Sequence, residues 1–197
     1  MHYFEKNLRR MRYLLCAGTA LLTTISACEP AANAEIKPPA AAPVTGESRR
    51  CGDGGYLSAR LFGSIDHTID WNADEVDCES MLRPRGEGMR LRFTGMAADE
   101  EVSIIIAVPD LERGVDGREL PAVVTLAVEG SGRFFSTANL DSCFADIAAR
   151  SGDAATAAQY DVHGTLFCVS ALGEINGEAA VSIPELQFQS RIDWGDQ

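Results

Sequence analysis

Apolar and polar residues alternate with a period of two along most of the chain after residue 55. The pattern is clearest at 89–94, where Met89, Leu91 and Phe93 would face a core and the arginines between them would face solvent. An apolar, β-branched run at 102–108 suits a buried central strand. The same reasoning predicts strands at 57–65, 69–71, 123–128, 160–169, 181–183 and 186–194.

Turn signals separate these segments. Gly130-Ser131-Gly132 predicts a hairpin over 122–137, and Asn176-Gly177 is the strongest short hairpin signal in the chain. Gly63 interrupts the first predicted strand and indicates a bulge there. Loops are predicted at 109–117 and 151–158.

Two segments allow more than one structure. The stretch 72–80 fits a polar loop or a single helical turn, and within 142–149 Phe144, Ile147 and Ala148 would share one face of a helix. About nine short strands with at most one short helix predict an all-β fold, either an antiparallel β-sandwich or a barrel.

The tripeptide Ile-Asp-Trp occurs twice, at 69–71 and at 192–194. One hypothesis is that the first and last strands of the domain are neighbours in which these residues have matching roles. Chance is the alternative explanation for a repeat of three residues.

The beginning of the chain has the pattern of an export signal. Four cations, Lys6, Arg9, Arg10 and Arg12, precede an uncharged apolar run at 13–25. This run is much shorter than the ~20 residues that a membrane-spanning helix needs. A basic start followed by a short apolar run therefore predicts a secretory signal, which can begin at Met1 or at Met11.

The run ends in Ile25-Ser26-Ala27-Cys28. These four residues resemble the lipobox of bacterial lipoproteins: an aliphatic residue, a small one, Gly or Ala, then Cys. The resemblance covers residues 1–28. It implies cleavage before Cys28, diacylglycerol on the Cys28 sulfur, and acylation of the new amino terminus with a fatty acid such as palmitate. Several acyl chains would hold the protein stably on a membrane.

In that family an Asp directly after the cysteine marks retention in the inner membrane. Glu29 stands there instead, so the resemblance implies an outer-membrane lipoprotein of the bacterial cell envelope, facing the periplasm. Ala32-Asn33-Ala34 is an alternative small-x-small cleavage site, and cleavage there would give a soluble periplasmic protein.

Three regions follow from these patterns: a signal peptide at 1–27, a lipidated Cys28 with a tether at 28–48, and one globular domain at 49–197. The tether is rich in Ala and Pro and has no periodic apolar pattern. Proline stiffens such a segment toward polyproline II. The remaining residues are enough for one domain with an adequate core.

The chain is acidic, with a formal net charge of −12. The exported part is more acidic still, because the signal contains four cations but only one acid, Glu5. This balance argues against nucleic acid as a partner, since phosphates require a basic surface. The expected partners are the membrane, through the lipid anchor, and an envelope protein or glycan.

Four cysteines remain after Cys16 leaves with the signal and Cys28 is lipidated: Cys51, Cys78, Cys143 and Cys168. An even number in an exported chain predicts disulfides. Of the three possible connectivities we expect Cys51–Cys78 and Cys143–Cys168, because they close the shortest loops. Each would stabilise the fold by ~3 kcal/mol. The closely spaced pairs typical of zinc sites are missing from the sequence.

Two charged clusters are candidate binding sites. The acidic cluster consists of Asp70, Asp74, Glu75, Asp77 and Glu79. Its first part, Asp70-x-Asn72-x-Asp74, begins like a calcium loop, but Glu75 and Met81 stand where that loop needs Gly and Glu. A looser calcium site and a solvated acidic loop remain as alternatives. The basic cluster, whose guanidinium groups match the geometry of carboxylate or phosphate, consists of Arg83, Arg85, Arg90 and Arg92.

One pair of residues could support catalysis. Asp161 and His163 are two residues apart on a predicted strand, so both side chains would point to the same face. None of the serines lies in a G-x-S-x-G elbow, and the sequence contains no dinucleotide fingerprint.

The favoured function is a membrane-anchored, non-enzymatic β-domain that binds an envelope component and needs no cofactor. The alternatives are a small-ligand or calcium-binding module, and a periplasmic enzyme that uses His163 and Asp161.

Overall fold

The computed structural model describes residues 51, 54–81, 87–151 and 159–194, and all of them fall in one compact unit. The predicted signal peptide, Cys28 and the tether lie outside the described residues, as does most of the predicted loop 151–158. Among the described residues, no helix has the length and apolar character needed to cross a membrane.

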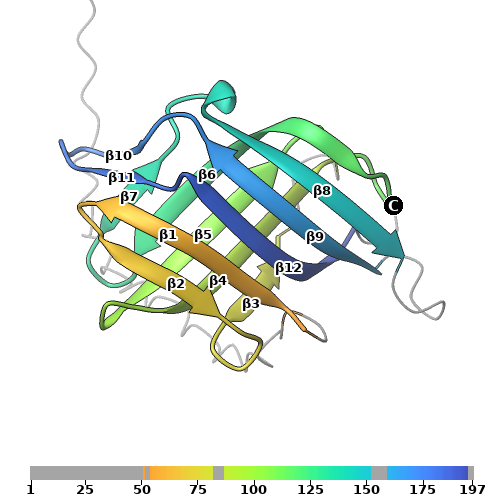
Figure 1. Ribbon diagram of the computed structural model, residues 1–197, viewed down its shortest axis with the longest axis horizontal. Coiled ribbons are helices and arrows are strands. Elements are labelled where there is room, and N and C mark those ends of the chain that lie inside the picture. Colours follow the sequence, from red (N-terminus) through yellow and green to blue (C-terminus); the bar gives the residue numbers. More distant parts are fainter. Residues whose placement is uncertain (1–50, 52–53, 82–86, 152–158, 195–197) are drawn as a thin grey trace, which may run out of the picture. The chain divides into compact units, whose positions relative to one another are not determined.

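Twelve strands and one short 3-10 turn, η2, make up the described fold (Figure 1). They are β1 (Tyr56–Gly63), β2 (His67–Trp71), β3 (Asp77–Ser80), β4 (Met89–Ala97), β5 (Glu100–Val108), β6 (Gly117–Val128), β7 (Arg133–Ser136), η2 (Leu140–Ser142), β8 (Cys143–Ser151), β9 (Gln159–Cys168), β10 (Leu172–Glu174), β11 (Ala180–Ser182) and β12 (Glu185–Asp193). The prediction of an all-β fold is confirmed.

The strands form two layers that share two strands. Sheet A has the order β2-β1-β12-β9-β8 and ends on the first half of β6; sheet B has the order β3-β4-β5, the second half of β6, then β7-β10-β11 and the end of β1. Every pairing is antiparallel. Because β6 and β1 belong to both sheets, hydrogen bonding continues from one layer into the other at two places. The fold is therefore sandwich-like in its two layers, while the strands β6-β7-β10-β11-β1-β12-β9-β8 pair in a closed ring, as in a flattened barrel.

Inward-facing apolar residues of both sheets form one core. The pattern predicted for 89–94 is observed, with Met89, Leu91 and Phe93 fully buried. Phe93 of sheet B meets Phe188 of sheet A edge-to-face, with the ring centroids 5.6 Å apart. Complete burial of each such side chain stabilises the fold by ~1.5–3 kcal/mol. The apolar run at 102–108 lies in β5 between β4 and β6, as expected of a central strand.

Gly63 lies where β1 passes from one sheet to the other. Its φ is +105°, and a Cβ there would lie 2.5 Å from the carbonyl oxygen of Ala180. Only glycine tolerates both conditions. The predicted irregularity at Gly63 is thus the end of β1, which leaves β12 and pairs with β11.

Both segments whose structure was ambiguous from the sequence contain a strand. Residues 72–76 form a turn, but β3 follows and holds Cys78, so the prediction of a loop or helical turn over 72–80 was wrong for its second half. The helical alternative for 142–149 was also wrong: Cys143–Ser151 is β8, preceded by η2. A full ladder to β9 on one side and a ladder to β6 on the other, which is interrupted between Gly117 and Leu120, stabilise β8 as a strand, and local sequence cannot show these pairings.

The two Ile-Asp-Trp segments have similar roles, but their strands are not neighbours as hypothesised, because β1 lies between β2 and β12. The first ends β2 and the second ends β12 and continues to Trp194, and both strands pair with β1 from opposite sides. Trp71 donates its indole N–H to the carbonyl oxygen of Met96 at 2.7 Å, and Trp194 donates to that of Gly88 at 2.9 Å. The two indoles therefore connect sheet A to opposite ends of β4.

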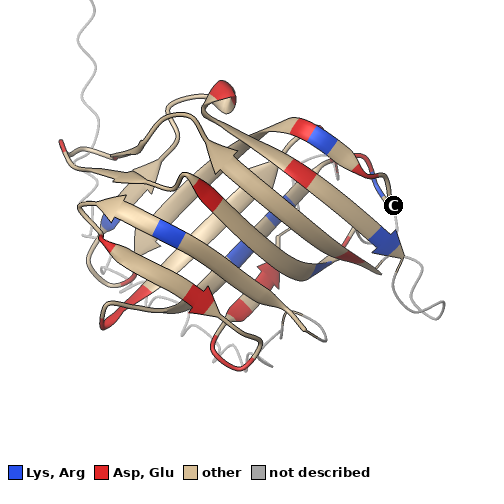
Figure 2. Cartoon of the chain, viewed as in Figure 1, with Lys and Arg blue, Asp and Glu red and all other residues tan. Residues whose placement is uncertain are grey.

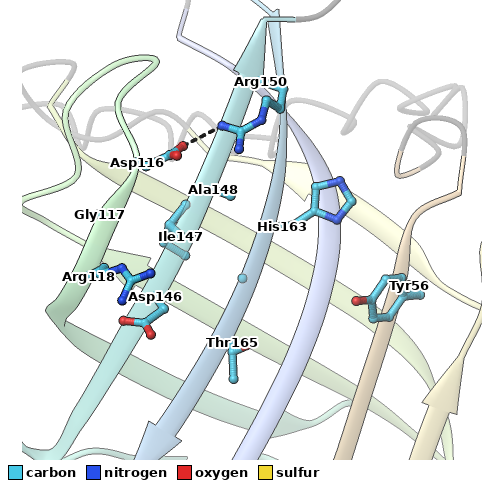
Figure 3. A pocket seen from close by; sticks show the side chains of 11 residues that line it. Tyr56, Asp116, Gly117, Arg118, Asp146, Ile147, Ala148, Arg150, His163 and Thr165 are labelled. Atoms are coloured by element: carbon cyan, nitrogen blue, oxygen red, sulfur yellow. Dashed lines mark hydrogen bonds and ion pairs between the residues drawn. The ribbon is translucent and has the colours of Figure 1, made fainter.

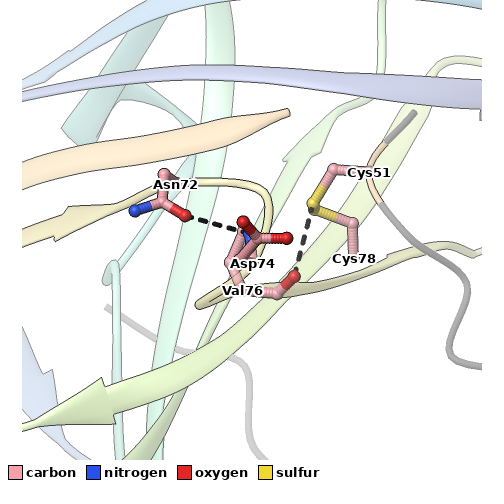
Figure 4. The surroundings of a disulfide bond; sticks show 5 residues. All are labelled: Cys51, Asn72, Asp74, Val76 and Cys78. Atoms are coloured by element: carbon pink, nitrogen blue, oxygen red, sulfur yellow. Dashed lines mark hydrogen bonds between the residues drawn. A yellow bond between two sulfur atoms is a disulfide. The ribbon is translucent and has the colours of Figure 1, made fainter. Parts of the chain in front are cut away.

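Both predicted disulfides are present. Cys143 and Cys168 are directly opposite on β8 and β9. Cys51 and Cys78 join the segment before β1 to the edge strand β3, and Cys51 Sγ lies 3.8 Å from the carbonyl oxygen of Val76 (Figure 4).

Candidate functional site

The outer face of sheet A carries two rows of uncharged, hydrogen-bonding side chains. Strand register places His163, Gln189 and Tyr56 side by side on β9, β12 and β1. The next outward row contains Thr165, Gln187 and Ser58 on the same strands. We call these six residues the polar grid. Alternation along each strand causes this arrangement, because the residues between them point into the core.

A groove of about 420 Å³ adjoins the polar grid, toward β8 and β6. Among the residues that line it are Tyr56, Arg118, Asp146, Ala148, His163 and Thr165. Figure 3 shows Arg118 and Asp146 on one side and His163 and Tyr56 on the other, with Ala148 between them. The small side chain of Ala148 leaves this space open. We call it the sheet-A groove.

A β-bulge in β6 positions one wall of the groove. The register between β6 and β8 shifts between Gly117 and Leu120, and Glu119 in this segment has a φ of +49°. Such a φ is uncommon for a residue with a side chain, and bulges often redirect side chains beside binding sites. Here Arg118 lies in the bulge and lines the groove.

Two carboxylates hold the bulge in place of ladder hydrogen bonds. Asp146 on β8 accepts a hydrogen bond from the backbone N–H of Glu119 at 2.7 Å. Asp116, just before β6, accepts from the backbone N–H of Ala149 at 2.9 Å and from Arg150 at 2.8 Å. The bond from the Ala149 N–H, followed by the one from Arg150, lowers the pKa of Asp116. Asp116 therefore serves the structure as an anion.

Other groups in the groove have no internal partner. Within the described part of the chain, the side chains of Arg118, His163, Tyr56 and Thr165 make no hydrogen bond or ion pair with one another or with other residues. Arg118, His163 and Thr165 are exposed, and Tyr56 is half-buried. Their donors and acceptors are available to a ligand.

The structure does not join Asp161 to His163. Both face outward from β9, as predicted, but Asp161 accepts a hydrogen bond from Arg191 Nε at 2.9 Å. No bond links Asp161 to the imidazole among the described residues. His163 instead lies at the groove without a group that orients it as a general base.

The predicted arginine cluster is only partly described. Arg83 and Arg85 lie outside the described residues. Arg92 forms an ion pair with Glu129 at 2.6 Å, and Ser103 Oγ donates to the same carboxylate oxygen at 2.5 Å. The serine bond, and then Arg92, lower the pKa of Glu129. Arg92 is thus held by an internal anion, whereas Arg90 on the same face has no ion pair within the described chain.

The acidic segment around Asp74 forms a capped turn. Asn72 Oδ1 accepts a hydrogen bond from the N–H of Asp74 at 3.0 Å, and the carboxylate of Glu75 accepts from the Asn72 backbone and side-chain amides. Figure 4 shows this turn beside the Cys51–Cys78 bond. The described residues contain no group of three or more His, Cys, Asp or Glu side chains arranged to hold a metal ion.

Sequence reasoning missed Arg118, Asp146 and Tyr56 as site residues. Each lies on a different strand, and only the register of β1, β12, β9, β8 and β6 brings them to one groove. The only local feature of the sequence near these residues was Gly117-Arg118 at the end of a predicted loop, and this pair does not by itself indicate a β-bulge.

Comparisons with protein-family models, with curated proteins and with solved structures found no match to this chain.

Proposed function

We propose that this chain is a lipid-anchored protein of the bacterial cell envelope whose β-sandwich binds an envelope component through the sheet-A groove, without catalysing a reaction. The lipobox-like residues Ile25 to Cys28 support the anchor. The Ala/Pro-rich segment after Cys28 would act as a tether between membrane and domain.

One observation carries the binding role: a groove whose lining residues have unused hydrogen-bonding groups. Arg118, His163 and Thr165 are exposed and make no internal hydrogen bonds among the described residues. Asp146 holds the bulge that carries Arg118, and Asp116 bonds β8 beside it, so the backbone of this wall is fixed before a ligand binds. A fixed backbone lowers the entropy cost of binding.

The groove supports binding better than catalysis. A general base is normally oriented by a hydrogen-bonded partner, but Asp161, the candidate partner of His163, is bonded to Arg191.

The anchor is tested by the intact mass of the protein from the membrane fraction of expressing cells. We expect the mass of a triacylated chain beginning at Cys28, with alkylation of four thiols only after reduction. A Cys28→Ala variant should remain unprocessed. A soluble, unacylated chain beginning at Glu35 would contradict the anchor.

The binding role is tested with the full mature chain and isolated outer-membrane and peptidoglycan fractions. Ala148→Trp fills the groove, and we expect it to abolish cosedimentation with the fraction that the parent binds. Ala107→Trp is the matched control, because Ala107 is a half-buried, outward-facing alanine in the middle of sheet B. Equal binding by both variants would sink the proposed site.

A further inference from the structure

The polar grid is uncharged in a chain that is strongly acidic. Charged residues make up 23% of the sequence, and the formal net charge is −12. Yet the six residues of the polar grid, in the middle of β9 and β12 and the first half of β1, are all serine, threonine, glutamine, tyrosine or histidine. The next outward residue of β1, Arg60, forms an ion pair with Asp66. In Figure 2 the middle of β9 and of β12 is tan, whereas β1 carries one basic segment near its middle, which is Arg60. A face that served only solubility would be expected to carry the acidic residues found elsewhere.

Formal charge at the groove itself is balanced. Asp116 forms an ion pair with Arg150 at 2.8 Å, so these two charges compensate each other. Asp146 and Arg118 add one charge of each sign. A carboxylate or phosphate ligand near Arg118 would also approach Asp146, and a cation would meet two guanidinium groups. Neither type of ion gains net Coulomb attraction here.

The available groups match hydroxyl-rich molecules. Arg118 offers several N–H donors, Asp146 retains acceptor capacity on its carboxylate, and Thr165 and Tyr56 both donate and accept. A sugar hydroxyl group also donates and accepts, and its bonds to a guanidinium or a carboxylate are charge-assisted. The ring of Tyr56 adds an apolar surface against which the C–H face of a sugar can pack.

The dimensions suit an extended ligand. Ala148, His163, Gln189 and Tyr56 form a row across β8, β9, β12 and β1. Neighbouring strands are ~4.8 Å apart, so this row is ~14 Å long. Among the described residues, His163 in this row is exposed and Ala148, Gln189 and Tyr56 are half-buried, so the row is accessible to a ligand from solvent.

We propose that the sheet-A groove and the polar grid bind an uncharged glycan segment that lies across β8, β9, β12 and β1. This inference rests on the proposed function, because it names the ligand class of the same site. Arg118 and Asp146 bind hydroxyl groups at the β6 side, and Thr165, His163 and Tyr56 bind the segment above the sheet.

The test is calorimetric titration of the full mature chain in detergent with neutral tetrasaccharides built from glucose, mannose or N-acetylglucosamine, and with tetragalacturonate as the carboxylated counterpart. We expect a neutral tetrasaccharide to bind more tightly than tetragalacturonate. Thr165→Val and Arg118→Gln should each weaken that binding about tenfold, the effect of losing one or two good hydrogen bonds. Thr68→Val, at an exposed, outward threonine of β2 beyond the grid, should bind as the parent does.

The outcomes separate the two proposals. Tighter binding of tetragalacturonate, or equal loss of neutral-glycan binding in Thr68→Val, would overturn the glycan inference. So would a failure of every saccharide to bind while Ala148→Trp still abolishes binding to envelope fractions; in that case the proposed function stands. If Ala148→Trp leaves envelope binding intact, the proposed site fails together with the ligand assigned to it.

Discussion

Two serines, Ser103 and Ser190, are equally buried but differ in what their hydroxyl groups contact. Each is 1% exposed. Ser103 Oγ donates to Glu129, accepts from Arg92 Nε at 3.1 Å and lies 2.8 Å from Thr94 Oγ1. Ser190 points into the core from β12, and its hydroxyl group has no hydrogen-bond partner among the described residues. A buried polar group without a partner lowers stability, whereas a satisfied one raises it modestly.

We therefore expect opposite effects from the same substitution. Ser190→Ala should leave the free energy of unfolding unchanged or raise it by up to about 1 kcal/mol, and Ser103→Ala should lower it by about 1–3 kcal/mol. Urea unfolding of the two variants measures both values. Equal losses would show that Ser190 has a partner after all.

Close packing at Gly164 gives a second prediction at this scale. A Cβ at Gly164 would lie 2.3 Å from ring atoms of Phe188 and 2.9 Å from Ile147 Cδ1. Gly164→Ala should lower the free energy of unfolding by about 1–3 kcal/mol, because the core beneath the groove must shift. Gly173→Ala is the control, since a methyl group at Gly173 would have no atom within 4 Å outside its chain neighbours. A neutral result at both positions would mean that β9 relaxes easily.

At the scale of elements, the bulge in β6 determines the shape of the groove. In a regular strand the ladder to β8 would continue from Gly117 to Leu120 without a shift. Arg118 and Glu119 would then point alternately to the two faces of the sheet, like the other residues of β6. The bulge interrupts this ladder, and Asp116 and Asp146 satisfy backbone N–H groups across it. The bonds that Asp116 accepts stabilise its ionised form, so their contribution to stability depends on pH, whereas the contribution of backbone ladder bonds does not.

This dependence predicts an effect of pH on stability. The pKa of Asp116 is lowered in the folded state, so its stabilisation is fully present above the usual pKa of an aspartate and is lost as the pH falls toward the lowered value. Asp116→Asn retains an acceptor oxygen but cannot ionise. Its unfolding free energy should fall less steeply than that of the parent on acidification from pH ~5 to pH ~3. Parallel curves from urea unfolding across this range would contradict the assignment.

At the scale of the whole molecule, the two disulfides close loops of nearly equal length in different surroundings. Their sequence separations are 27 for Cys51–Cys78 and 25 for Cys143–Cys168. Cys143 and Cys168 lie within the continuous β8–β9 ladder. Cys78 lies on β3, which pairs with β4 only among the described strands. The two disulfides therefore reduce the conformational entropy of the unfolded chain by similar amounts. In the folded chain, Cys143–Cys168 lies within the β8–β9 ladder, whereas Cys51–Cys78 holds the edge strand β3.

Replacing either cysteine pair by alanine should lower the free energy of unfolding by a similar amount, about 3–4 kcal/mol in the chain-entropy model. Loss of Cys51–Cys78 should also accelerate amide hydrogen exchange in β3, whereas loss of Cys143–Cys168 should leave β3 protected. Exchange measured by mass spectrometry under native conditions distinguishes the two. Equal protection of β3 in both variants would show that pairing with β4 is sufficient to hold it.

Local sequence determined most strands, because alternation shows directly which residues of a strand are buried. Met89, Leu91 and Phe93 illustrate this. It failed for β3, β8 and β10: β3 is a short edge strand with a single ladder, β8 has an apolar pattern that also fits a helix, and β10 has only three residues beside a turn. Hydrogen bonds to neighbours far along the chain decide such segments, and no local pattern contains them.

The sequence by itself determined the all-β class, the hairpin around Gly130 and the two disulfides, since each follows from periodicity, turn chemistry or loop length. Tertiary structure alone decided the site. Arg118, Ala148, His163 and Tyr56 come from four strands, and only strand register places them beside one groove. It also separated Asp161 from His163, because cross-strand pairing put Arg191 opposite the aspartate. The physical reason is that side chains on a sheet meet their neighbours across strands, at positions that the order of pairing sets and the linear sequence does not.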